Sequence, residues 1–341
     1  MNTPTLTTRQ RTTSGTTMQA ITQDRYGEAE DVLRLEEIAR PAIGEDEVLL
    51  RVHAAGVDRG VWHLMTGLPY PVRFAGYGFR APKTPVRGRE VAGTVEAAGP
   101  AVTALHVGDE VFGIADGSFA RYASAQPGQL APKPANLTYT QAAAVPVSAL
   151  TALQAVRDRG HVQAGNRVLI LGASGGVGTF AVQIAKAAGA EVTGVCRTAK
   201  MDTIRSLGVD HVIDYTREDI AAAGRRYDVI LDIGGNRPLT QLRSVLGPRG
   251  TLVIVGGETG GRWLAGSDRQ LRALLCSRFT GQTLTTLICS ENTADLLALT
   301  KLIESSQVRP VIDQIYPLSQ TPEAIRYMRD GHAQGKVVIN L

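Results

Sequence analysis

The chain has few cysteines and no long apolar run. Its 341 residues include three cysteines, Cys196, Cys276 and Cys289, which show no C-x-x-C spacing. Scattered thiols of this kind exclude a disulfide framework and favour a reducing compartment. After residue 17 no apolar stretch is long enough to cross a bilayer, and the N-terminus lacks the apolar core of a signal peptide. We therefore expect a cytoplasmic protein that does not bind membranes.

Runs of a single charge sign are also missing. Lysine and arginine number 36 against 32 aspartate and glutamate residues, which gives a net charge of +4. The two signs are interspersed along the chain, whereas nucleic-acid-binding proteins gather basic residues in a patch or stripe. The sequence therefore predicts no nucleic-acid partner, and we assign the excess positive charge to solubility and to an anionic cofactor.

The distribution of strands and turns predicts two domains. Residues 1–17 are rich in threonine and are expected to form a disordered tail. Residues 18–141 alternate short apolar strands with glycine and proline turns, which is typical of a β-rich domain. Residues 142–290 form the second domain, and residues 291–341 return to the first through strands expected at 308–312 and 336–339.

The second domain has the pattern of a doubly wound parallel sheet. Helices are expected over 141–156 and 295–305. Between them, helical stretches separate six strand candidates, at 167–171, 191–195, 210–213, 227–232, 250–255 and 283–288. Strands that alternate with crossover helices predict a Rossmann sheet. The expected fold class is therefore α/β, with the Rossmann domain inserted into the β-rich domain and a ligand cleft between the two.

A glycine-rich turn carries the most specific signal. Gly172, Gly175 and Gly178 are spaced three apart, between the apolar run 167–170 and the helical run 179–186. Glycine allows a sharp strand-to-helix turn and lets the backbone approach a pyrophosphate with no Cβ in the way. The first N–H groups of the helix then bind the anion. The stretch predicts a dinucleotide site that also includes Ser174, Gly176 and Val177, and the alternative is an ordinary tight turn.

The end of the next strand indicates which dinucleotide binds. Sites for NAD commonly place an Asp or Glu there to hold the ribose hydroxyls, and such a carboxylate repels a 2′-phosphate. The strand 191–195 instead runs into Cys196-Arg197-Thr198-Ala199-Lys200. Two cations and a hydroxyl suit a phosphate, so we predict NADPH rather than NADH. The alternative is a solvated basic loop.

Several motifs in order point to one family. They are Tyr26-Gly27, RGREVAGTVEAAGPAV at 87–102, VGDEVFG at 107–113, GSFARYA at 117–123, AAAVPVSALTA at 142–152, LGASGGVGTFAVQIAKAAGAEVTGVC at 171–196, LGVDHVIDY at 207–215 and GHAQGKVVI at 331–339. The chain thereby resembles the medium-chain dehydrogenase/reductase superfamily, in its zinc-free quinone oxidoreductase and enoyl reductase branch. The resemblance implies a GroES-like catalytic domain with an inserted Rossmann domain, and a homodimer joined through the last Rossmann strands.

The resemblance also implies cofactor contacts at matching positions. Gly175, Gly176 and Val177 would lie at the pyrophosphate, and Gly256 and Gly257 behind the nicotinamide. The group around the adenosine phosphate would be Arg197, Thr198, Lys200 and Tyr215, and Lys336 would reach the cofactor from the end of the β-rich domain. Tyr215 is alternatively the end of a short strand, and Lys336 a charge that protects a sheet edge.

The chain departs from the zinc-containing members of the superfamily. Those members need a cysteine early in the β-rich domain and a Gly-His-Glu, whereas this chain has no cysteine before Cys196 and reads Gly88-Arg89-Glu90. The N and S ligands that a tetrahedral zinc requires are therefore missing at these positions. Without a Lewis acid, alcohol–ketone interconversion loses its usual charge stabilisation. We therefore predict metal-independent reduction of a quinone or of an activated C=C bond.

Candidate catalytic residues lie in the β-rich domain. Relatives carry an asparagine near the nicotinamide ribose where this chain has Asp58, whose carboxylate would accept ribose hydrogen bonds or relay a proton; a surface pair with Arg59 is the alternative. His63 suits proton transfer near neutral pH, and Tyr26, Tyr70 and solvent are further candidate donors. The glycine- and proline-punctuated stretch around 67–71 predicts a loop toward the cleft that carries Trp62, His63, Met65, Tyr70 and Tyr77. The aromatic residues among them would stack on a flat substrate. Arg262-Trp263 and the helix at 269–275 would line the pocket or an interface.

Three functions remain open at this stage. The first is an NADPH-dependent reductase whose partner is a small electrophile, an enone, enal or quinone. The second is a weakly catalytic NADPH-binding sensor or RNA-associated protein, which the absence of a basic run disfavours. The third is a specialised carbonyl reductase or a biosynthetic reductase of the polyketide type.

Overall fold

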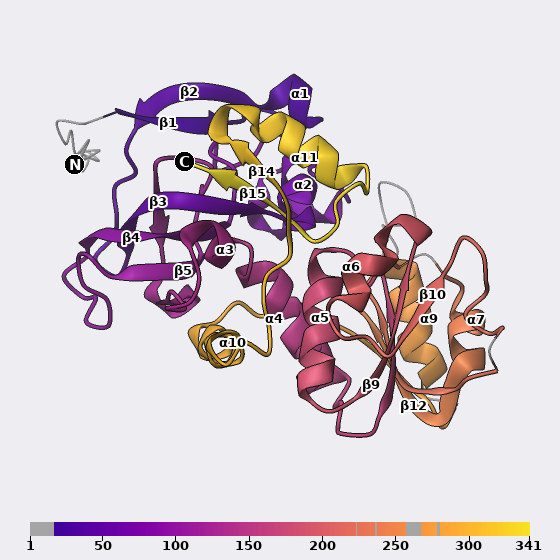
Figure 1. Ribbon diagram of the computed structural model, residues 1–341. Coiled ribbons are helices and arrows are strands. Elements are labelled where there is room, and N and C mark those ends of the chain that lie inside the picture. Colours follow the sequence, from indigo (N-terminus) through magenta and orange to yellow (C-terminus); the bar gives the residue numbers. More distant parts are fainter. Residues whose placement is uncertain (1–16, 223, 236, 257–266, 278–279) are drawn as a thin grey trace, which may run out of the picture.

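Two bodies, each built around one sheet, make up the protein (Figure 1). The computed structural model describes residues 17–222, 224–235, 237–256, 267–277 and 280–341. Gly257 and the pair Arg262-Trp263, to which the sequence analysis assigns roles, lie outside these ranges. So do residues 1–16, whereas Thr17, which was expected in the tail, is the first residue of a strand.

The second body contains a six-stranded sheet in which every strand is parallel to its neighbours. The strand order is β10 (His211–Asp214), β9 (Glu191–Cys196), β8 (Arg167–Leu171), β11 (Tyr227–Asp232), β12 (Leu246–Ile254) and β13 (Thr283–Thr286). All six strands expected from the sequence are present. The order reverses between β8 and β11, and ligands of doubly wound sheets bind at the carboxyl ends of the strands at such a switch point.

Helices cover both faces of this sheet, because strands buried on both sides need apolar cover. Val168, Leu169 and Ile170 of β8 are all fully buried. Figure 1 shows α5 on one side of the sheet and α9 on the other. The helices of this body are α5 (Gly176–Ala187), the short η4 (Thr198–Lys200), α6 (Met201–Arg205), α7 (Leu239–Val245) and α9 (Ser267–Ser277).

The first body is built on a mixed sheet to which both ends of the chain contribute, antiparallel except for the parallel pair β14 and β15. Its strand order is β14 (Ile312–Pro317), β15 (Lys336–Asn340), β3 (Val48–Val57), β4 (Glu90–Ala98), β5 (Glu110–Ile114) and β7 (Leu130–Pro132), with β6 (Tyr122–Ala125) also paired to β3. Strand β15 runs antiparallel to β3, so the C-terminal segment returns to this sheet as the sequence predicts. Beside it, β1 (Thr17–Thr22) and β2 (Arg34–Ala39) form a two-stranded sheet.

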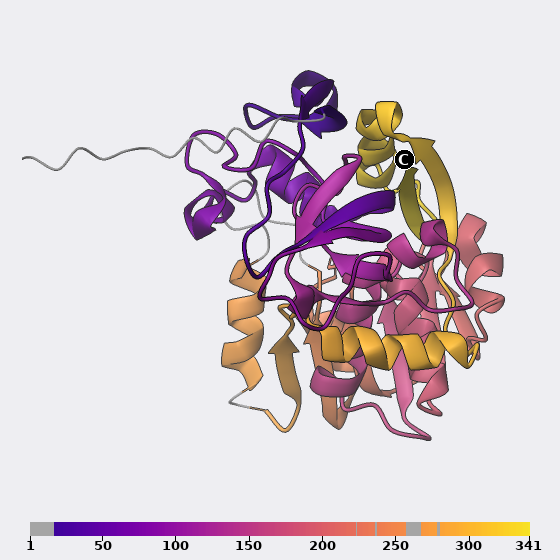
Figure 2. The same ribbon diagram turned by 90° about the vertical axis from the view of Figure 1, so that its left-hand side faces the viewer.

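Short helices complete the first body and lead into the second. They are α1 (Ala29–Val32), α2 (Arg59–Thr66), η1 (Arg73–Tyr77), η2 (Pro127–Gln129), α3 (Tyr139–Ala143), α4 (Pro146–Gln154), η3 (Ala155–Arg159), α10 (Thr293–Glu304), η5 (Leu318–Gln320) and α11 (Thr321–Arg329). Helix α10 lies along the boundary of the two bodies (Figure 2) and is tied to α4, where Gln154 donates a 2.8 Å hydrogen bond to Asp295.

Two sequence expectations are wrong in detail, and proline is the reason for both. The expected helix over 141–156 is broken between α3 and α4, because Pro146 starts a new helix at its first position. The strand expected at 308–312 begins only at Ile312, after Pro310, which has no N–H to give to a ladder. Val308 packs into the core instead.

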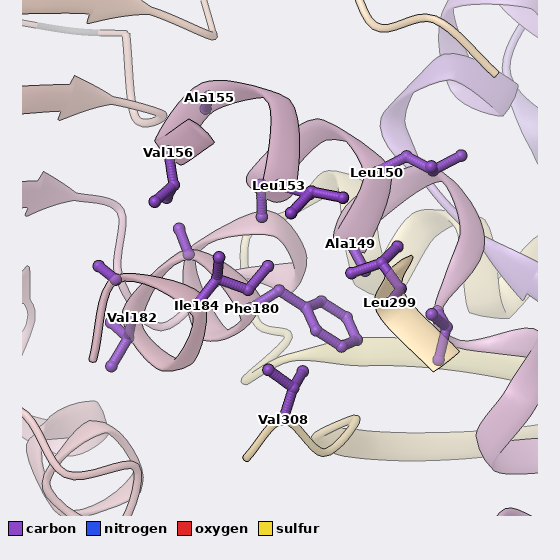
Figure 3. Packing of buried hydrophobic residues seen from close by; sticks show 14 of the residues in the cluster. Ala149, Leu150, Leu153, Ala155, Val156, Phe180, Val182, Ile184, Leu299 and Val308 are labelled. Atoms are coloured by element: carbon purple, nitrogen blue, oxygen red, sulfur yellow. The ribbon is translucent and has the colours of Figure 1, made fainter. Parts of the chain in front are cut away.

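The largest apolar core joins the two bodies. Figure 3 shows Leu150 and Leu153 of α4 above Phe180 of α5, with Leu299 of α10 and Val308 beside them. Each of these side chains is at most 5% exposed, and burying one contributes about 1.5–3 kcal/mol. This core therefore fixes α5, which follows the glycine turn, against the helix that leaves the first body.

No helix within the described ranges is long and apolar enough to cross a membrane. All three cysteines are free thiols.

Candidate functional site

The glycine turn lies at the switch point of the parallel sheet, between β8 and α5. Gly172 has φ +77°, a conformation that only glycine adopts readily. A Cβ on Gly178 would lie 2.1 Å from the carbonyl oxygen of Gly172, so this glycine allows the helix to pack closely on the turn. Gly175 differs, because a Cβ there would meet no atom nearer than 3.5 Å. Gly175 therefore leaves open space at the first turn of α5, whose N–H groups have no intrahelical partners.

This open space fits the pyrophosphate of a dinucleotide. The residues that follow, Gly176 and Val177, are half-buried and belong to the first turn of the helix. Ser174 is 7% exposed, and its carbonyl oxygen accepts a 3.0 Å hydrogen bond from the N–H of Gly335. The three glycines thus differ: Gly172 makes the tight turn, Gly178 allows close packing, and Gly175 is the predicted anion cradle.

The C-terminal segment meets the glycine turn through Lys336. Its Nζ donates hydrogen bonds to Oε2 of Glu90 at 2.5 Å and to Oγ of Ser148 at 3.1 Å. Lys336 is 2% exposed and belongs to an interior strand, so the edge-charge interpretation is wrong. A Cβ on Gly176 would lie 3.0 Å from Cδ of Lys336, which places the lysine stem against the predicted cofactor turn.

Glu90 is held in place from three sides. Its Oε1 accepts a 2.9 Å hydrogen bond from the N–H of Val147, and Lys336 holds Oε2. A Cβ on Gly56 would lie 2.3 Å from Oε2, so only glycine leaves room for the carboxylate. Burial raises the pKa of Glu90 to about 7, the charge of Lys336 lowers it, and the nearby charge of Asp58 raises it.

Asp58 caps the helix that follows β3. Its Oδ1 accepts a 3.1 Å hydrogen bond from the N–H of Val61, as expected of an N-cap residue. Asp58 is 8% exposed, and its Oδ2 is buried without a hydrogen-bond partner. A buried carboxylate oxygen without a partner is costly. The hydroxyl of a bound ribose would supply the missing donor, and a surface pair with Arg59 does not describe this residue.

The predicted adenosine end lies after β9. Arg197 is exposed and forms no ion pair in the part of the chain that the structure describes. The Thr198 hydroxyl donates to Asp214, a contact that the sequence analysis missed because Asp214 belongs to the neighbouring strand β10. Thr216 donates to the same carboxylate through N at 3.0 Å and Oγ1 at 2.7 Å. Tyr215 is 46% exposed beside them.

Lys200 has partners that the sequence does not reveal. It is 8% exposed, and its Nζ donates to the carbonyl oxygens of Ala333 at 2.6 Å and Gly331 at 3.1 Å. Burial lowers the pKa of this lysine, as does the neighbouring charge of Arg197. An ammonium has three donors, so one remains for a phosphate after these two bonds.

The remaining glycine of the set has a packing role. A Cβ on Gly256 would lie 2.1 Å from the carbonyl oxygen of Ile233, so Gly256 allows the ends of β11 and β12 to approach each other. Beside them, Asp232 is fully buried and accepts a hydrogen bond from Arg269, the first residue of the predicted pocket helix. The guanidinium of Arg269 thus faces the sheet rather than the cavity described below.

The three candidate proton donors all have other partners. His63 and Met65 lie on α2 and not in a loop, so that expectation is wrong, and Met65 is fully buried. His63 Nδ1 donates a 2.9 Å hydrogen bond to the carbonyl oxygen of Leu68. The Tyr26 hydroxyl donates to the carbonyl of Gly78 at 2.6 Å, and burial raises its pKa. The Arg73 guanidinium lies over the rings of Tyr26 and Tyr70.

A cavity of about 220 Å³ lies between α2 and the segment 83–89. Its apolar wall includes Val61 and Leu64 of α2 and Val86, and its polar wall includes Arg87 and Arg89. None of the three candidate donors lines it, whereas Tyr77 of the predicted stacking set does. The sequence predictions include Arg89 only as the residue that stands in place of a zinc-ligating histidine, and they do not include Arg87. For both arginines, residue type is the one signal that the sequence contains.

Arg89 occupies the centre of the Gly-Arg-Glu motif and is anchored to the segment that precedes α10. Its Nη2 donates a 2.5 Å hydrogen bond to Oε2 of Glu291. The charge of Glu291 raises the pKa of Arg89 against the lowering effect of burial. In the described ranges no group of three His, Cys, Asp or Glu side chains is arranged to hold a metal ion.

Comparisons with known proteins agree with this architecture. The family described as "Alcohol dehydrogenase GroES-like domain" matches residues 44–135, and the one described as "Zinc-binding dehydrogenase" matches residues 207–339. Mouse (Mus musculus) "NAD(P)H oxidoreductase RTN4IP1, mitochondrial" is 32% identical over 96% of this chain and 90% of its own length. Arabidopsis thaliana "NADPH-dependent alkenal/one oxidoreductase, chloroplastic" is 32% identical over 94% of this chain and 79% of its own. The solved quinone oxidoreductase of Coxiella burnetii superposes with a TM-score of 0.84 at 27% identity, over 96% of this chain and 100% of that one.

Proposed function

Because the chain belongs to the medium-chain dehydrogenase/reductase superfamily, in its quinone oxidoreductase and enoyl reductase branch, we propose that it is an NADPH-dependent reductase. Its substrate would be a quinone or the activated C=C bond of an α,β-unsaturated carbonyl compound, reduced without a metal ion. The observation that carries the proposal is the cradle at Gly175, which leaves the first turn of α5 open at the switch point of the sheet.

The residues that would hold the cofactor come from both bodies. The N–H groups of Gly176 and Val177 would bind the pyrophosphate at the start of α5. Arg197 and the third donor of Lys200 would bind the 2′-phosphate, because both cations lie where β9 ends. The unpaired Oδ2 of Asp58 would accept a hydrogen bond from the nicotinamide ribose. Lys336 would help to position the glycine turn through the contact of its side chain with Gly176.

A nicotinamide, when bound, would supply hydride to the β-carbon of a conjugated carbonyl. Negative charge would develop on the carbonyl oxygen as the hydride adds, before a proton reaches the α-carbon, and hydrogen-bond donors aimed at that oxygen would lower the barrier. Arg89 is suited to this task because it lines the cavity and a guanidinium has five donors, of which Glu291 takes one. Since His63 and Tyr26 donate to backbone carbonyls, we propose that water in the open cavity delivers the proton.

We further propose a homodimer joined through the β13 edge of the parallel sheet. Among the described strands, β13 has a neighbour on one side only, and an unpaired edge is a template for a second chain. Near it, α9 exposes Leu271 at 60% and Leu275 at 54%, and Ile288 after β13 is 88% exposed. We also propose a cytoplasmic location, although the names of two relatives are mitochondrial and chloroplastic.

The proposed function is tested by following NADPH oxidation with a panel of quinones, enones, enals, acyl thioesters and aldehydes. Each reaction is run with the purified protein before and after dialysis against a chelator, with zinc content measured by mass spectrometry. We expect turnover with quinones or enones at a rate that dialysis does not change. Loss of activity on chelation, restored by zinc, would contradict the metal-independent part of the proposal.

The second candidate, a sensor with little catalysis, makes a different prediction for the same panel. It predicts tight NADPH binding with no turnover of any electrophile. RNA binding that weakens steeply with salt would then favour the RNA-associated alternative.

A further inference from the structure

Arg87 is a buried cation at the wall of the cavity. It is 7% exposed, and its Nε is buried without a hydrogen-bond partner. No carboxylate in the described ranges forms an ion pair with it. Burial lowers the pKa of its guanidinium, which reflects the cost of keeping the charge away from water.

The backbone holds Arg87 rigidly in this position. Its N–H donates a 3.2 Å hydrogen bond to the carbonyl oxygen of Ile21, and its own carbonyl oxygen accepts a 2.9 Å bond from the N–H of Phe119. The backbone of Arg87 is thus fixed between β1 and the segment that precedes β6. Within the described residues, its charge at the cavity wall has no carboxylate partner.

The charges around the cavity favour an anion. Lys83, Arg87 and Arg89 line it, and the one carboxylate among its described lining residues is Asp116, which is exposed. Glu291 neutralises Arg89 from outside the cavity wall. Once the ion pair of Arg89 with Glu291 is counted, Arg87 and Lys83 leave the cavity with a positive charge.

A carboxylate fits this environment better than other small anions. A planar guanidinium binds a carboxylate through two parallel hydrogen bonds, and such pairs are strong where water is excluded. The apolar wall of Val61, Leu64 and Val86 would receive a short carbon chain. A volume of about 220 Å³ is below the range of pockets for drug-sized ligands, so the ligand is small.

We propose that this cavity binds a carboxylate group of the substrate, so that the electrophile reduced by this protein is a small α,β-unsaturated carbonyl compound that carries a carboxylate. The inference rests on the proposed function for the reduction step, and on Arg87 alone for the recognition step. The cavity lies next to the predicted reaction centre, because Arg89 directly precedes Glu90 and because Asp58 caps the helix that forms its apolar wall. Arg87 would then fix the carboxylate end while Arg89 contacts the carbonyl oxygen.

The test compares an acid with its ester. The rate constant kcat/KM is measured with saturating NADPH for (E)-4-oxopent-2-enoate and for its methyl ester, which has the same enone but no charge. We expect the wild-type protein to prefer the acid at least tenfold. Arg87→Gln should remove this preference, and Arg121→Gln, which changes an exposed arginine outside the cavity, should leave it unchanged.

A binding measurement separates this inference from the proposed function. Calorimetry with 4-oxopentanoate, the saturated acid, needs no turnover, and we expect binding that Arg87→Gln weakens at least tenfold. If neither enone is reduced but this binding depends on Arg87, the carboxylate site is confirmed while the proposed function, and with it the substrate assignment, fails. If acid and ester are reduced equally well and 4-oxopentanoate does not bind the wild-type protein, the inference is overturned. Inorganic phosphate that competes more strongly than the carboxylate would also overturn it.

Discussion

Lys336 and Glu90 form a buried ion pair in which Nζ lies 2.5 Å from Oε2, although the two residues are 246 positions apart in the sequence. The pair joins β15 to β4, and through Ser148 it also reaches α4, which leads into the second body. Lys336 in turn lies against Gly176 at the predicted pyrophosphate site. The pair thus connects the C-terminal strand, the Gly-Arg-Glu motif and the glycine turn.

Removing one member of this pair should be costly. Lys336→Met leaves the Glu90 carboxylate buried without its counter-ion, which typically costs about 3–5 kcal/mol. We expect the free energy of unfolding, measured by denaturant titration, to fall by this amount. The exposed pair Arg205 and Asp202 provides a control, because Arg205→Met should change stability by less than about 0.5 kcal/mol. Equal effects at both sites would contradict the role of burial.

The pair also predicts a pH dependence of stability. Because burial raises the pKa of Glu90 from 4.5 to about 7, the folded protein takes up a proton in this window that the unfolded chain does not. The free energy of unfolding contributed by this group therefore falls as pH rises from 4.5 to 7, at up to about 1.4 kcal/mol per pH unit. In denaturant titrations at several pH values, Glu90→Gln should flatten this decline. An unchanged slope in the variant would assign the decline to other groups.

The different tasks of the glycines can be separated by two alanine substitutions. Gly175→Ala places a Cβ in open space, so we expect an unchanged melting temperature but NADPH binding weakened roughly 10–100-fold. Gly178→Ala brings a Cβ against the carbonyl of Gly172 and should cost about 3 kcal/mol of stability. Thermal melts and fluorescence titration with NADPH measure both effects. Normal NADPH binding by Gly175→Ala would refute the cradle.

Asp58 combines a helix cap with a free acceptor, and conservative substitution distinguishes the two. Asn also caps helices, but its one side-chain oxygen is then used by the cap and its NH2 group takes the place of Oδ2, so Asp58→Asn should keep stability but weaken NADPH binding. Asp58→Ala should lose about 1 kcal/mol of stability from the cap and roughly tenfold in NADPH affinity. Thr138→Ala, at the cap of α3, is the control that loses stability alone. If Asp58→Ala binds NADPH as the wild type does, Asp58 is a cap and nothing more.

The proposed preference for NADPH rests on the cations after β9. Arg197→Ala should raise KM for NADPH roughly tenfold and leave KM for NADH unchanged, because only NADPH carries the 2′-phosphate. Arg225→Ala removes an equally exposed arginine that pairs with Glu191 at the opposite end of β9, and neither KM should respond. Equal losses for both cofactors in Arg197→Ala would remove the basis for the NADPH assignment.

Local patterns predicted the parallel sheet well, because its strands are short apolar runs separated by helices. All six strands and the glycine turn were found where the sequence places them. The prediction of a loop around His63 failed because the glycine and proline residues at 67–71 follow a complete helix that Asp58 caps. Its N-cap residue and the apolar residues after it are a signal that could have revealed the helix.

Contacts between distant segments could not be predicted in the same way. The carbonyl oxygens that bind Lys200 come from a loop 131 and 133 residues later, and Asp214 approaches Thr198 only because β10 pairs with β9. Arg87 lies in the charged run Arg87-Gly88-Arg89-Glu90 and Lys336 is a single charge before an apolar strand, and neither shows a periodicity that marks it as buried. The fold has to bring such residues together before their chemistry can be recognised.

The most direct test of the central claim follows the hydride itself. NADPH deuterated at C4, prepared separately in the 4R and 4S forms, is incubated with the metal-free protein and (E)-4-oxopent-2-enoate, and the product is examined by mass spectrometry and NMR. Our account predicts one deuterium at the former β-carbon of 4-oxopentanoate from one of the two forms, and none from the other. Oxidation of both forms without deuterium in the product would contradict direct hydride transfer from cofactor to substrate.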